Sequence, residues 1–422
     1  MNVVPLKIVH LSTYLNGGAG SAAYRLHKAL LKNNVDSSFV CLEQTPGSDN
    51  TAFTLKRPTV PLWARAIKKV LWLLPWLNDK LINKRTADIR KFEAIYPSLQ
   101  CSFASLPFSS LRVLEHPAVI AADIIHLHWI AGMIDYPTFF KKNNKPVVWT
   151  LHDMNPFSGL YHYTEDEIRN EDITGAFSRN IHGVKKTAIQ HRRNLLTFVT
   201  PSNWLLQEAG KSDTFKGIPG IMIPNPVDTE DFSPRDTKML RHLLKIPKEN
   251  TVFIFVAETV DDYRKGFDLL TEALKALISF PVTLLAIGKG VRPEGIPGDI
   301  RFLGSTNDPK KLSEYYSLAD ALIIPSREDN LPNVMTEAMA CGTPVISFDT
   351  GGMSTTIEDG FNGFRAKVIS AVSLKETLIE FIKVKESFKR ESIRLFAMEH
   401  FGFDKVSRQY QAVYETLPPE NN

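Results

Sequence analysis

The chain has 422 residues, of which 43% are apolar, 10% aromatic and 23% charged. This apolar fraction is too high for a disordered chain, and the length is enough to fill the cores of about two or three domains. Fifty lysines and arginines stand against 46 acidic residues, which leaves a net charge of only +4. So small a surplus excludes a surface that is basic overall, and we expect no nucleic-acid partner.

The cysteines and the amino-terminal residues indicate in which cellular compartment the protein is expected. Cys41, Cys101 and Cys341 lie far apart, so they indicate neither a zinc site of their own nor the disulfide framework of a secreted protein. The first residues lack the basic and apolar regions of a secretory signal. No apolar run reaches the roughly 18–20 residues of a membrane span. We therefore expect a cytoplasmic protein.

Strands and helices alternate from the start of the chain. Leu6–Ser12 is a short apolar run, Asn16–Gly20 is a glycine-rich turn, and Ser21–Lys32 carries apolar residues at helical spacing. Three further runs have the almost continuous apolar character of buried strands: Asp123–Trp129, Pro146–His152 and Leu195–Pro201. Such strands, separated by helices, indicate a parallel sheet that is covered on both faces.

The segment Thr59–Arg85 departs from this alternation. Trp63 and Ile67 begin a series of apolar residues at roughly helical intervals, and Lys68 and Lys69 lie beside them. A basic helix rich in tryptophan and leucine suits the headgroup layer of an anionic membrane, which predicts a peripheral membrane contact at the inner face of the membrane. An ordinary helix packed on its own domain is the alternative.

The alternation pauses at Ile221–Pro234, where three prolines and three acids interrupt any regular element. It then restarts with four apolar strands, Thr251–Ala257, Pro281–Gly288, Ala319–Ser326 and Thr343–Asp349. The helices expected between them cover Gly266–Ser279, Pro309–Leu318 and Pro332–Ala340. The sequence therefore predicts two α/β halves joined by a proline-bearing linker.

The stretch Pro325–Gly352 is the most informative part of the sequence. Its first residues form a loop at the carboxyl end of a strand, and Pro332 is well placed as the first residue of the next helix. Ligands bind at the carboxyl ends of strands in such sheets, and a helix start suits a phosphate. Asp329 in the loop and Glu337 on the helix can point towards one ligand and accept hydrogen bonds from sugar hydroxyls. The alternative is a solvated acidic loop beside a surface glutamate.

This stretch, with Asp329 and Glu337 separated by seven residues and followed by Ala-Met-Ala-Cys-Gly-Thr-Pro-Val-Ile, resembles the donor-site motif of retaining glycosyltransferases of family 4. That family uses nucleotide sugars and has the GT-B fold, two Rossmann-like domains facing across a cleft. The resemblance implies that the first acid contacts the donor sugar and the second the nucleotide ribose. Asp329 replaces the family's first glutamate, and Glu328 lies outside the motif's spacing. Asn330 and Leu331 are expected to line the same site.

A second segment, Asp261–Leu274, resembles the part of the family in which a lysine before a glycine binds the donor diphosphate. Lys265 holds that position. An Ala-Glu pair at residues 257–258 replaces the Gly-Arg of the family, and Arg264 is the expected substitute for the missing cation. Both cations would neutralise the charge that develops on the departing diphosphate. Gly288 is assigned to the donor site by the same resemblance, and the alternative for the cations is a solvated helix start.

At the amino end, Gly17, Gly18 and Gly20 resemble the family's glycine-rich loop facing the cleft, where the backbone can approach a ligand closely. The Gly-x-Gly-x-x-Gly pattern is absent, which argues against a dinucleotide site, and a merely tight turn is the alternative.

His152 matches the histidine that approaches the donor sugar in family members, so we expect it to be catalytic together with Asp329 and Lys265. A structural histidine is an equal alternative. His126 and His128 alternate along one strand and share a face, for which we expect a structural or acceptor-lining role rather than metal binding. No Asp-x-Asp, His-Glu-x-x-His, Gly-x-Ser-x-Gly or Walker A motif occurs, and we expect no metal and no bound cofactor.

The segment Thr150–Tyr163 resembles members that build bacterial surface polysaccharides, such as colanic acid or O-antigen units. The prediction is a hexosyltransferase whose UDP- or GDP-linked donor binds a domain of residues 223–402. Its acceptor, a saccharide or a saccharide linked to a polyprenyl lipid, would bind a domain of residues 1–222, on which 403–422 pack back. The family retains anomeric configuration and needs no protein nucleophile. The alternatives are a non-catalytic nucleotide-binding partner and a GT-B sugar phosphorylase or epimerase.

Overall fold

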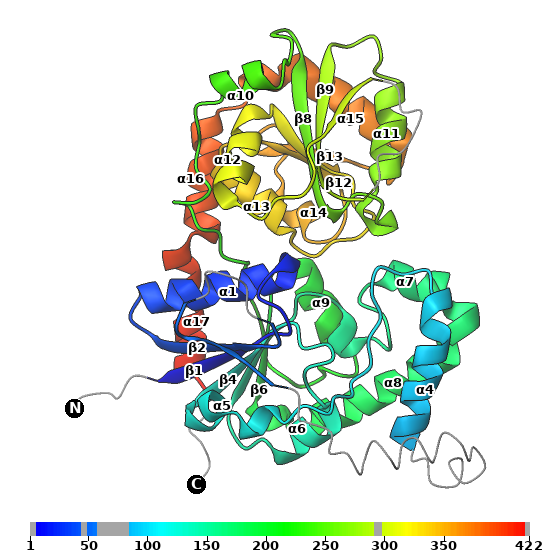
Figure 1. Ribbon diagram of the computed structural model, residues 1–422, viewed down its shortest axis with the longest axis vertical. Helices are drawn as coiled ribbons and strands as arrows, with labels where there is room; N and C mark the ends of the chain where they lie inside the picture. The colour runs from blue at the N-terminus through cyan, green and yellow to red at the C-terminus, as the bar shows by residue number, and fades with distance from the viewer. Residues whose placement is uncertain (1–5, 44–48, 57–83, 291–297, 418–422) are drawn as a thin grey trace.

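The computed structural model describes residues 6–43, 49–56, 84–290 and 298–417. Within them the chain forms two lobes, one above the other, each built around a parallel sheet (Figure 1). This confirms the predicted α/β class with two Rossmann-like domains. The segment expected to contact a membrane, Thr59–Arg85, lies outside the described residues except for its last two. No helix in the described part is long and apolar enough to cross a bilayer.

The lower lobe holds a seven-stranded parallel sheet. In spatial order its strands are β3 (Ala52–Thr54), β2 (Asp36–Cys41), β1 (Lys7–Leu11), β4 (Ile124–Leu127), β5 (Val147–Thr150), β6 (Leu196–Thr200) and β7 (Gly220–Met222). The chain starts in the middle, moves outwards to β3 and returns to β4 on the other side of β1. The register places His10 opposite His126.

Strand residues of the lower lobe alternate between two apolar layers, as pleated strands require. One layer, under α1 (Gly17–Lys32) and α17 (Phe403–Glu415), contains Ile8, Ile124, Val148 and Val199. The other layer contains Val9, Ile125, Leu127 and Trp149. The helices that cover it are α5 (Pro117–Ala121), α6 (Tyr136–Lys142), α8 (Glu171–His191) and α9 (Asn203–Lys211). The sheet is therefore buried on both faces, as its apolar strands predict.

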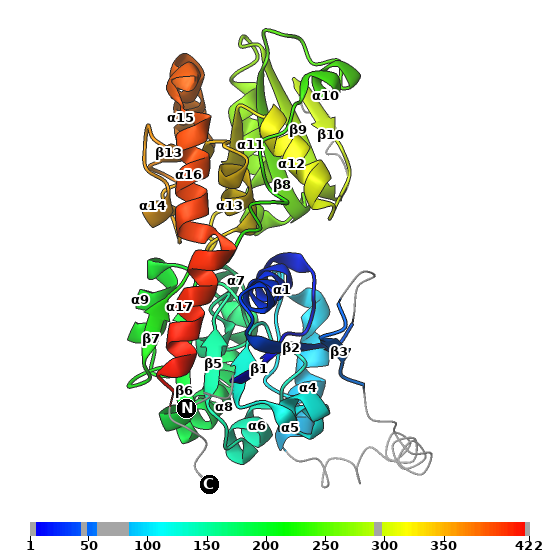
Figure 2. The ribbon, with the colours of Figure 1, turned by 90° about the vertical axis from the view of Figure 1, so that its left-hand side faces the viewer.

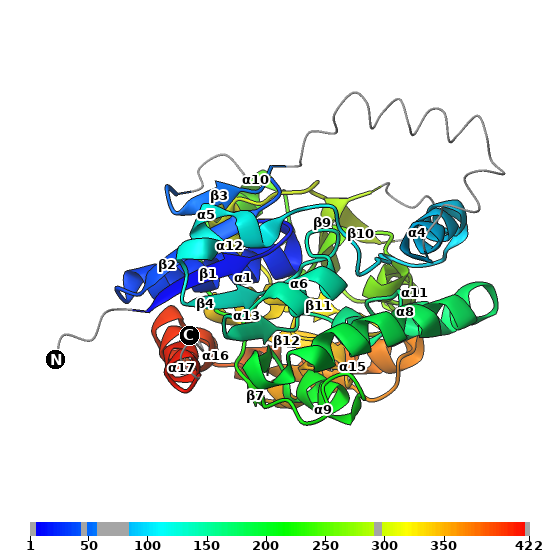
Figure 3. The same ribbon diagram turned by 90° about the horizontal axis from the view of Figure 1, so that it is seen from below.

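Two helices extend this lobe at its side. In the view from below, α4 (Lys84–Ile95) lies at the outer side of α8, where Lys84 donates a hydrogen bond to Asn180 (Figure 3). The short α7 (Thr164–Arg169) precedes α8 and reaches up to the other lobe.

The upper lobe holds a six-stranded parallel sheet around one continuous apolar core. Its strands in spatial order are β10 (Asp299–Phe302), β9 (Val282–Lys289), β8 (Thr251–Thr259), β11 (Ala321–Ile324), β12 (Val345–Phe348) and β13 (Gly363–Ala366). Its helices are α10 (Lys238–Leu243), α11 (Phe267–Lys275), α12 (Pro309–Leu318), α13 (Asn333–Ala340), α14 (Met353–Thr356), α15 (Ala371–Val384) and α16 (Arg390–Phe401).

The two lobes are joined at one side by two adjacent crossings. The linker residue Val227 donates its backbone N–H to the carbonyl of Phe401 at 2.8 Å, at the end of α16. After Gly402 the chain enters α17, which runs down along the lower lobe (Figure 2). The proposed domain boundary at 222/223 falls directly after β7, the last strand of the lower sheet.

Some local expectations were wrong. The glycine-rich turn at Asn16–Gly20 is the first turn of α1, which begins at Gly17. Pro332 is the residue before α13 rather than its first residue. The start of the supposedly irregular linker is the short edge strand β7, which pairs with β6. This segment has a weak local propensity for a strand, and it forms one because it pairs with the edge of an existing sheet.

Replacing Tyr410 of α17 with alanine tests whether this helix is part of the lower lobe. Tyr410 is 2% exposed, packs in the layer under α1 and α17, and hydrogen-bonds Thr150 through its hydroxyl at 2.8 Å. Because the cavity cannot refill, we expect a loss of about 3–5 kcal/mol in the free energy of unfolding by denaturant. The exposed Arg408 on the same helix provides the control, and R408A should leave stability within about 0.5 kcal/mol.

Candidate active site between the lobes

The carboxyl ends of the strands of both sheets face the interface between the lobes. In each sheet there are two adjacent strands from which the chain continues in opposite directions along the sheet. In the upper sheet these strands are β8 and β11, because the chain moves from β8 out to β10 before it returns. Such a point of divergence is where ligands bind in open α/β sheets. Lys265 follows β8 and Asp329 follows β11, so the topology places both at this point.

Asp329 is shared between two cations. Its Oδ2 lies 2.6 Å from Nζ of Lys265 and 3.3 Å from Nη1 of Arg264. Arg264 also stacks over the ring of Tyr163, 4.1 Å from its centroid, and donates to the carbonyl of Glu328 at 3.0 Å. The structure thus brings together the three residues that the sequence assigned to the diphosphate and the donor sugar.

Arg264 and Asp329 are buried in this cluster, and Lys265 is half-buried. Burial alone would raise the pKa of the Asp329 carboxyl, but Lys265 and Arg264 bring it below its ordinary value. Burial and the neighbouring Arg264 lower the pKa of Lys265, against the opposing effect of Asp329. Nε of Arg264 is buried without a hydrogen-bond partner among the described residues. Arg264 also lies 3.8 Å from the carboxylate of Asp262, so two carboxylates balance the two cations. The cations and the free Nε donor can bind an anion such as a diphosphate if it displaces a carboxylate from them.

Glu337, the second predicted acid, points across the interface. Its Oε1 accepts a hydrogen bond from Nη2 of Arg25 at 2.6 Å, and its Oε2 accepts one from the hydroxyl of Tyr316 at 3.0 Å. Arg25 comes from α1 of the lower lobe and was missed in the sequence, although it projects from the helix that follows the predicted glycine turn. Nη1 of Arg25 is buried without a partner in the described part of the chain, so this corner also has an unused donor.

The residues after Asp329 hold the lobes together. Asn330 accepts a hydrogen bond from Oγ of Ser202 at 2.6 Å and donates to the carbonyl of His152 at 3.1 Å. Leu331 is buried, and its carbonyl accepts from Asn225 at 3.4 Å. At position 288 packing requires a glycine, because an added Cβ would lie 2.4 Å from the carbonyl oxygen of Ala257.

The three amino-terminal glycines lie in the first turn of α1, where Gly17 and Gly18 face the upper lobe and Gly20 packs within the lower one. The carbonyl of Gly18 accepts a hydrogen bond from Asn333 at 2.7 Å. An added Cβ on Gly17 would lie 3.9 Å from the carboxylate of Glu258, the residue that replaces the family's arginine. At Gly20 an added Cβ would approach the carbonyl of Tyr14 to 2.5 Å, so the first turn of the helix packs on the backbone before it.

The half-buried His152 ends a chain of histidines whose other members are buried. Its Nε2 lies 3.2 Å from Nδ1 of His128, whose Nε2 lies 2.9 Å from Nδ1 of His10. His126 lies beside them and contacts the hydroxyls of Thr150 and Tyr414 at 2.8 and 2.7 Å. Burial lowers the pKa of each of the four, that of His152 to about 4, so all are neutral at pH 7.

His10, His126 and His128 each present a nitrogen within 4.8 Å of the others, which is a geometry that could hold a metal ion. Most of these nitrogens already have hydrogen-bond partners, either in another histidine or in the hydroxyls of Thr150 and Tyr414. Nε2 of His10 alone among them has no partner in the described residues. The contact with His128 instead fixes the tautomer and the orientation of the His152 ring, because a hydrogen bond to one imidazole nitrogen sets the tautomer.

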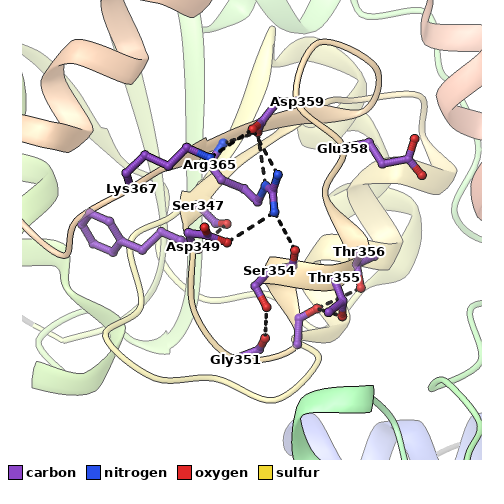
Figure 4. Close-up of polar contacts among 12 residues, drawn as sticks. Ser347, Asp349, Gly351, Ser354, Thr355, Thr356, Glu358, Asp359, Arg365 and Lys367 are labelled. Atoms are coloured by element: carbon purple, nitrogen blue, oxygen red, sulfur yellow. Dashed lines mark hydrogen bonds and ion pairs between the residues drawn. The ribbon is translucent and has the colours of Figure 1, made fainter.

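A second layer of polar contacts supports the loop of Asp329. Added Cβ atoms on Gly351 and Gly352 would lie 1.8 Å from the carbonyl oxygens of Asp329 and Asn330, so only glycines fit against this loop. Arg365 anchors the glycines from behind by binding Asp359, Asp349 and the carbonyl of Ser354, as Figure 4 shows. The loop is therefore clamped between the glycines and the cations.

The histidine chain predicts a pH dependence of stability. The unfolded chain binds protons near pH 6.5 that the folded chain excludes down to about pH 4 at His152, so the free energy of unfolding should fall as the pH falls between these values. Each such histidine contributes up to about 1.4 kcal/mol per pH unit. Denaturant titrations from pH 4.5 to 6.5 should show a flatter slope for H128N. The exposed His400 is the control, and equal slopes for H128N and wild type would contradict the assignment.

Comparison with known proteins agrees with this geometry. The family model described as Glycosyltransferase Family 4 matches residues 16–231, just over half of the chain, and the model described as Glycosyl transferases group 1 matches residues 250–383. A D-inositol 3-phosphate glycosyltransferase of Streptosporangium roseum is 25% identical over 57% of this chain and 57% of its own length. A phosphatidyl-myo-inositol mannosyltransferase of Mycolicibacterium smegmatis is 30% identical over 48% of this chain and 53% of its own. The chain thus spans little more than half the length of these curated relatives.

Solved structures share the fold at low identity. Anabaena HepE in complex with UDP-glucose is 16% identical, with a TM-score of 0.64 over 98% of this chain and 100% of that one. Sucrose-phosphate synthase from Thermosynechococcus elongatus is 17% identical, with a TM-score of 0.64 over 97% of this chain and 98% of that one. These likenesses confirm the expected GT-B arrangement of two facing Rossmann-like lobes. With a family model that covers more than half of its residues, the chain belongs to glycosyltransferase family 4.

Proposed function

We propose that this protein is an active glycosyltransferase that moves a sugar from a nucleoside diphosphate sugar to an acceptor hydroxyl. The observation that carries the proposal is the buried cluster of Arg264, Lys265 and Asp329 at the divergence point of the upper sheet. It combines two cations for a diphosphate with a carboxylate for sugar hydroxyls. The matching family models support the same reaction class.

The diphosphate of the donor would take over the cations that now share Asp329. Lys265 and Arg264 then neutralise the charge that grows on the leaving diphosphate, which lowers the barrier because the dipoles and charges are already in place. Asp329, released from Lys265, accepts hydrogen bonds from the donor sugar. Its side chain is one methylene shorter than a glutamate, which restricts how far into the site the sugar can lie.

The nucleotide ribose would lie at Glu337. A carboxylate accepts two hydroxyl hydrogen bonds, and here Arg25 and Tyr316 orient both of its oxygens. Asn330, Leu331 and Gly288 complete the donor side in this proposal, while Gly17, Gly18 and Gly20 begin the helix that carries Arg25 across the interface.

The reaction would retain the anomeric configuration. The acceptor hydroxyl attacks the anomeric carbon on the face from which the diphosphate leaves, and the departing phosphate oxygen takes the hydroxyl proton. No protein nucleophile is required. His152 is neutral and fixed by His128, so it can hydrogen-bond the donor sugar without adding charge.

For the finer assignment we propose a UDP- or GDP-linked hexose as co-substrate, no further cofactor, and a saccharide acceptor in the assembly of a bacterial surface polysaccharide. The resemblance of Thr150–Tyr163 to polysaccharide-type members supports the pathway. The composition of Thr59–Arg85 supports a lipid-linked acceptor at the membrane face. The two relatives are named for different acceptors, an inositol phosphate and a phosphatidylinositol. Their names therefore do not identify the acceptor of this chain.

A variant of Lys265 tests the diphosphate site. In calorimetric titrations with UDP and GDP, we expect one of the two to bind wild type and K265A to bind it at least tenfold more weakly, because a buried charged hydrogen bond contributes about 1.5–3 kcal/mol. The exposed Lys248 of the same lobe is the matched control, and K248A should bind as wild type does. Equal affinities of K265A and wild type would refute the site.

A variant of Glu337 separates ribose from phosphate recognition. E337Q keeps the shape but weakens both hydroxyl hydrogen bonds, so we expect it to lose about tenfold in affinity for the nucleoside diphosphate. Binding of inorganic pyrophosphate, which has no ribose, should stay within twofold of wild type. A parallel loss for both ligands would place Glu337 at the phosphates instead.

A further inference from the structure

Three aromatic side chains form a partly exposed group on the lower lobe that the donor site does not use. The rings of Tyr14 and Trp129 lie 5.7 Å apart with their planes 28° from parallel, and the ring of Phe103 lies 5.0 Å from that of Trp129. Tyr14 is 42% exposed, and the other two are half-buried. We call Tyr14, Phe103 and Trp129 the aromatic group.

The aromatic group lies at the divergence point of the lower sheet. Tyr14 follows β1 and Trp129 follows β4, the neighbouring strands from which the chain leaves in opposite directions. Ligands bind at this point in open α/β sheets, as they do between β8 and β11 of the upper sheet.

Buried polar groups fix the orientation of the indole. Nε1 of Trp129 donates to Oδ2 of Asp153 at 2.9 Å, and Nδ1 of His162 lies 2.6 Å from the same oxygen. Oγ of Ser105 lies 3.1 Å from the other nitrogen of His162. Burial would raise the pKa of Asp153, but His162 brings it below its ordinary value, so the carboxylate stays charged. An indole held this firmly at a surface is prepared for a ligand, since little side-chain entropy is lost on binding.

The aromatic group also faces the donor cluster. Ser102, next to Phe103, donates a hydrogen bond across the interface to Asp262 at 2.7 Å, three residues before Lys265. Asp153, which holds Trp129, directly follows His152. A molecule on the aromatic group therefore lies beside the place where the donor sugar would be transferred.

We propose that the aromatic group binds an uncharged pyranose ring of the acceptor. This inference rests on the proposed transfer reaction and names the substrate class for its second site. The C–H groups on one side of a pyranose form an apolar face with slight positive charge, which stacks on the negative face of an aromatic ring. Its hydroxyls point outwards and pair with polar groups at the rim, as is usual in small-molecule sites.

Charge at the rim selects against an anionic acceptor. Glu43 is exposed and forms a backbone β-bridge with Tyr14. Glu258 lies beside Gly17, which follows Tyr14 at the start of α1. Lys289 pairs with Glu258 at 3.5 Å, which leaves a net charge of −1 on these three exposed side chains. A phosphate on the acceptor ring would be repelled here. This chain therefore differs from its relative named for inositol 3-phosphate.

Saturation-transfer NMR with the intact protein tests the inference. The probes are methyl pyranosides of gluco, galacto and manno configuration, each measured with saturating UDP and again with GDP. For at least one of them we expect transfer concentrated on the ring protons of a single face. The signal should fall at least threefold in Y14A and in F103A and persist in Y14F, which keeps the ring. Myo-inositol 3-phosphate should neither bind nor compete.

Two controls make the result decisive. Thermal unfolding identifies a variant that fails to fold, and the exposed position of Tyr14 makes Y14A the safer of the two ring deletions. Calorimetry should give the same nucleotide affinity in all variants, so a failed donor site is recognised separately. No saturation of any pyranoside by wild type, an undiminished signal in Y14A and F103A, or stronger binding of the inositol phosphate would each overturn the proposal.

Discussion

A buried carboxylate that two cations share sets the geometry of the interface between the lobes. Lys265 and Arg264 reach Asp329 from the end of β8, while Asp329 itself stands at the end of β11. Three charges in a poorly solvated place are stable only if their positions are fixed, because each unpaired charge would be costly there. The glycines at 351–352 and the anchor Arg365 provide this rigidity from the upper lobe.

The same cluster links the two lobes. Arg25 of the lower lobe binds Glu337, and Asn330 binds the backbone of His152. Glu328 accepts hydrogen bonds from the backbone N–H groups of Thr164 and Glu165 at the start of α7. These contacts describe a closed arrangement in which the donor-site acids are buried. In the function proposed here, the lobes would separate to admit a nucleotide sugar, and we expect the crossings at Val227 and Gly402 to be the pivot.

The sequence predicted the architecture well, because nearly continuous apolar strands separated by helices have few folds that bury them. It also predicted that Asp329, Lys265 and Arg264 belong to one site, because two segments resemble the family's donor site and Arg264 was the substitute for a cation missing from its usual place. It could not predict Arg25, because an arginine on an amphipathic helix is indistinguishable from a solvated one until the second lobe is placed against it. The sequence predicted only part of the histidine chain. The alternation of His126 and His128 indicated a shared face, but His10 joins them only through the pairing of β1 with β4.

The most direct test of the donor site is the structure of the protein crystallised with the nucleoside diphosphate that binds it. We expect the β-phosphate to lie within hydrogen-bond distance of both Lys265 and Arg264, Asp329 to have left Lys265, and the ribose hydroxyls to hydrogen-bond Glu337. A nucleotide bound elsewhere, with the Lys265–Asp329 pair intact at 2.6 Å, would contradict this assignment.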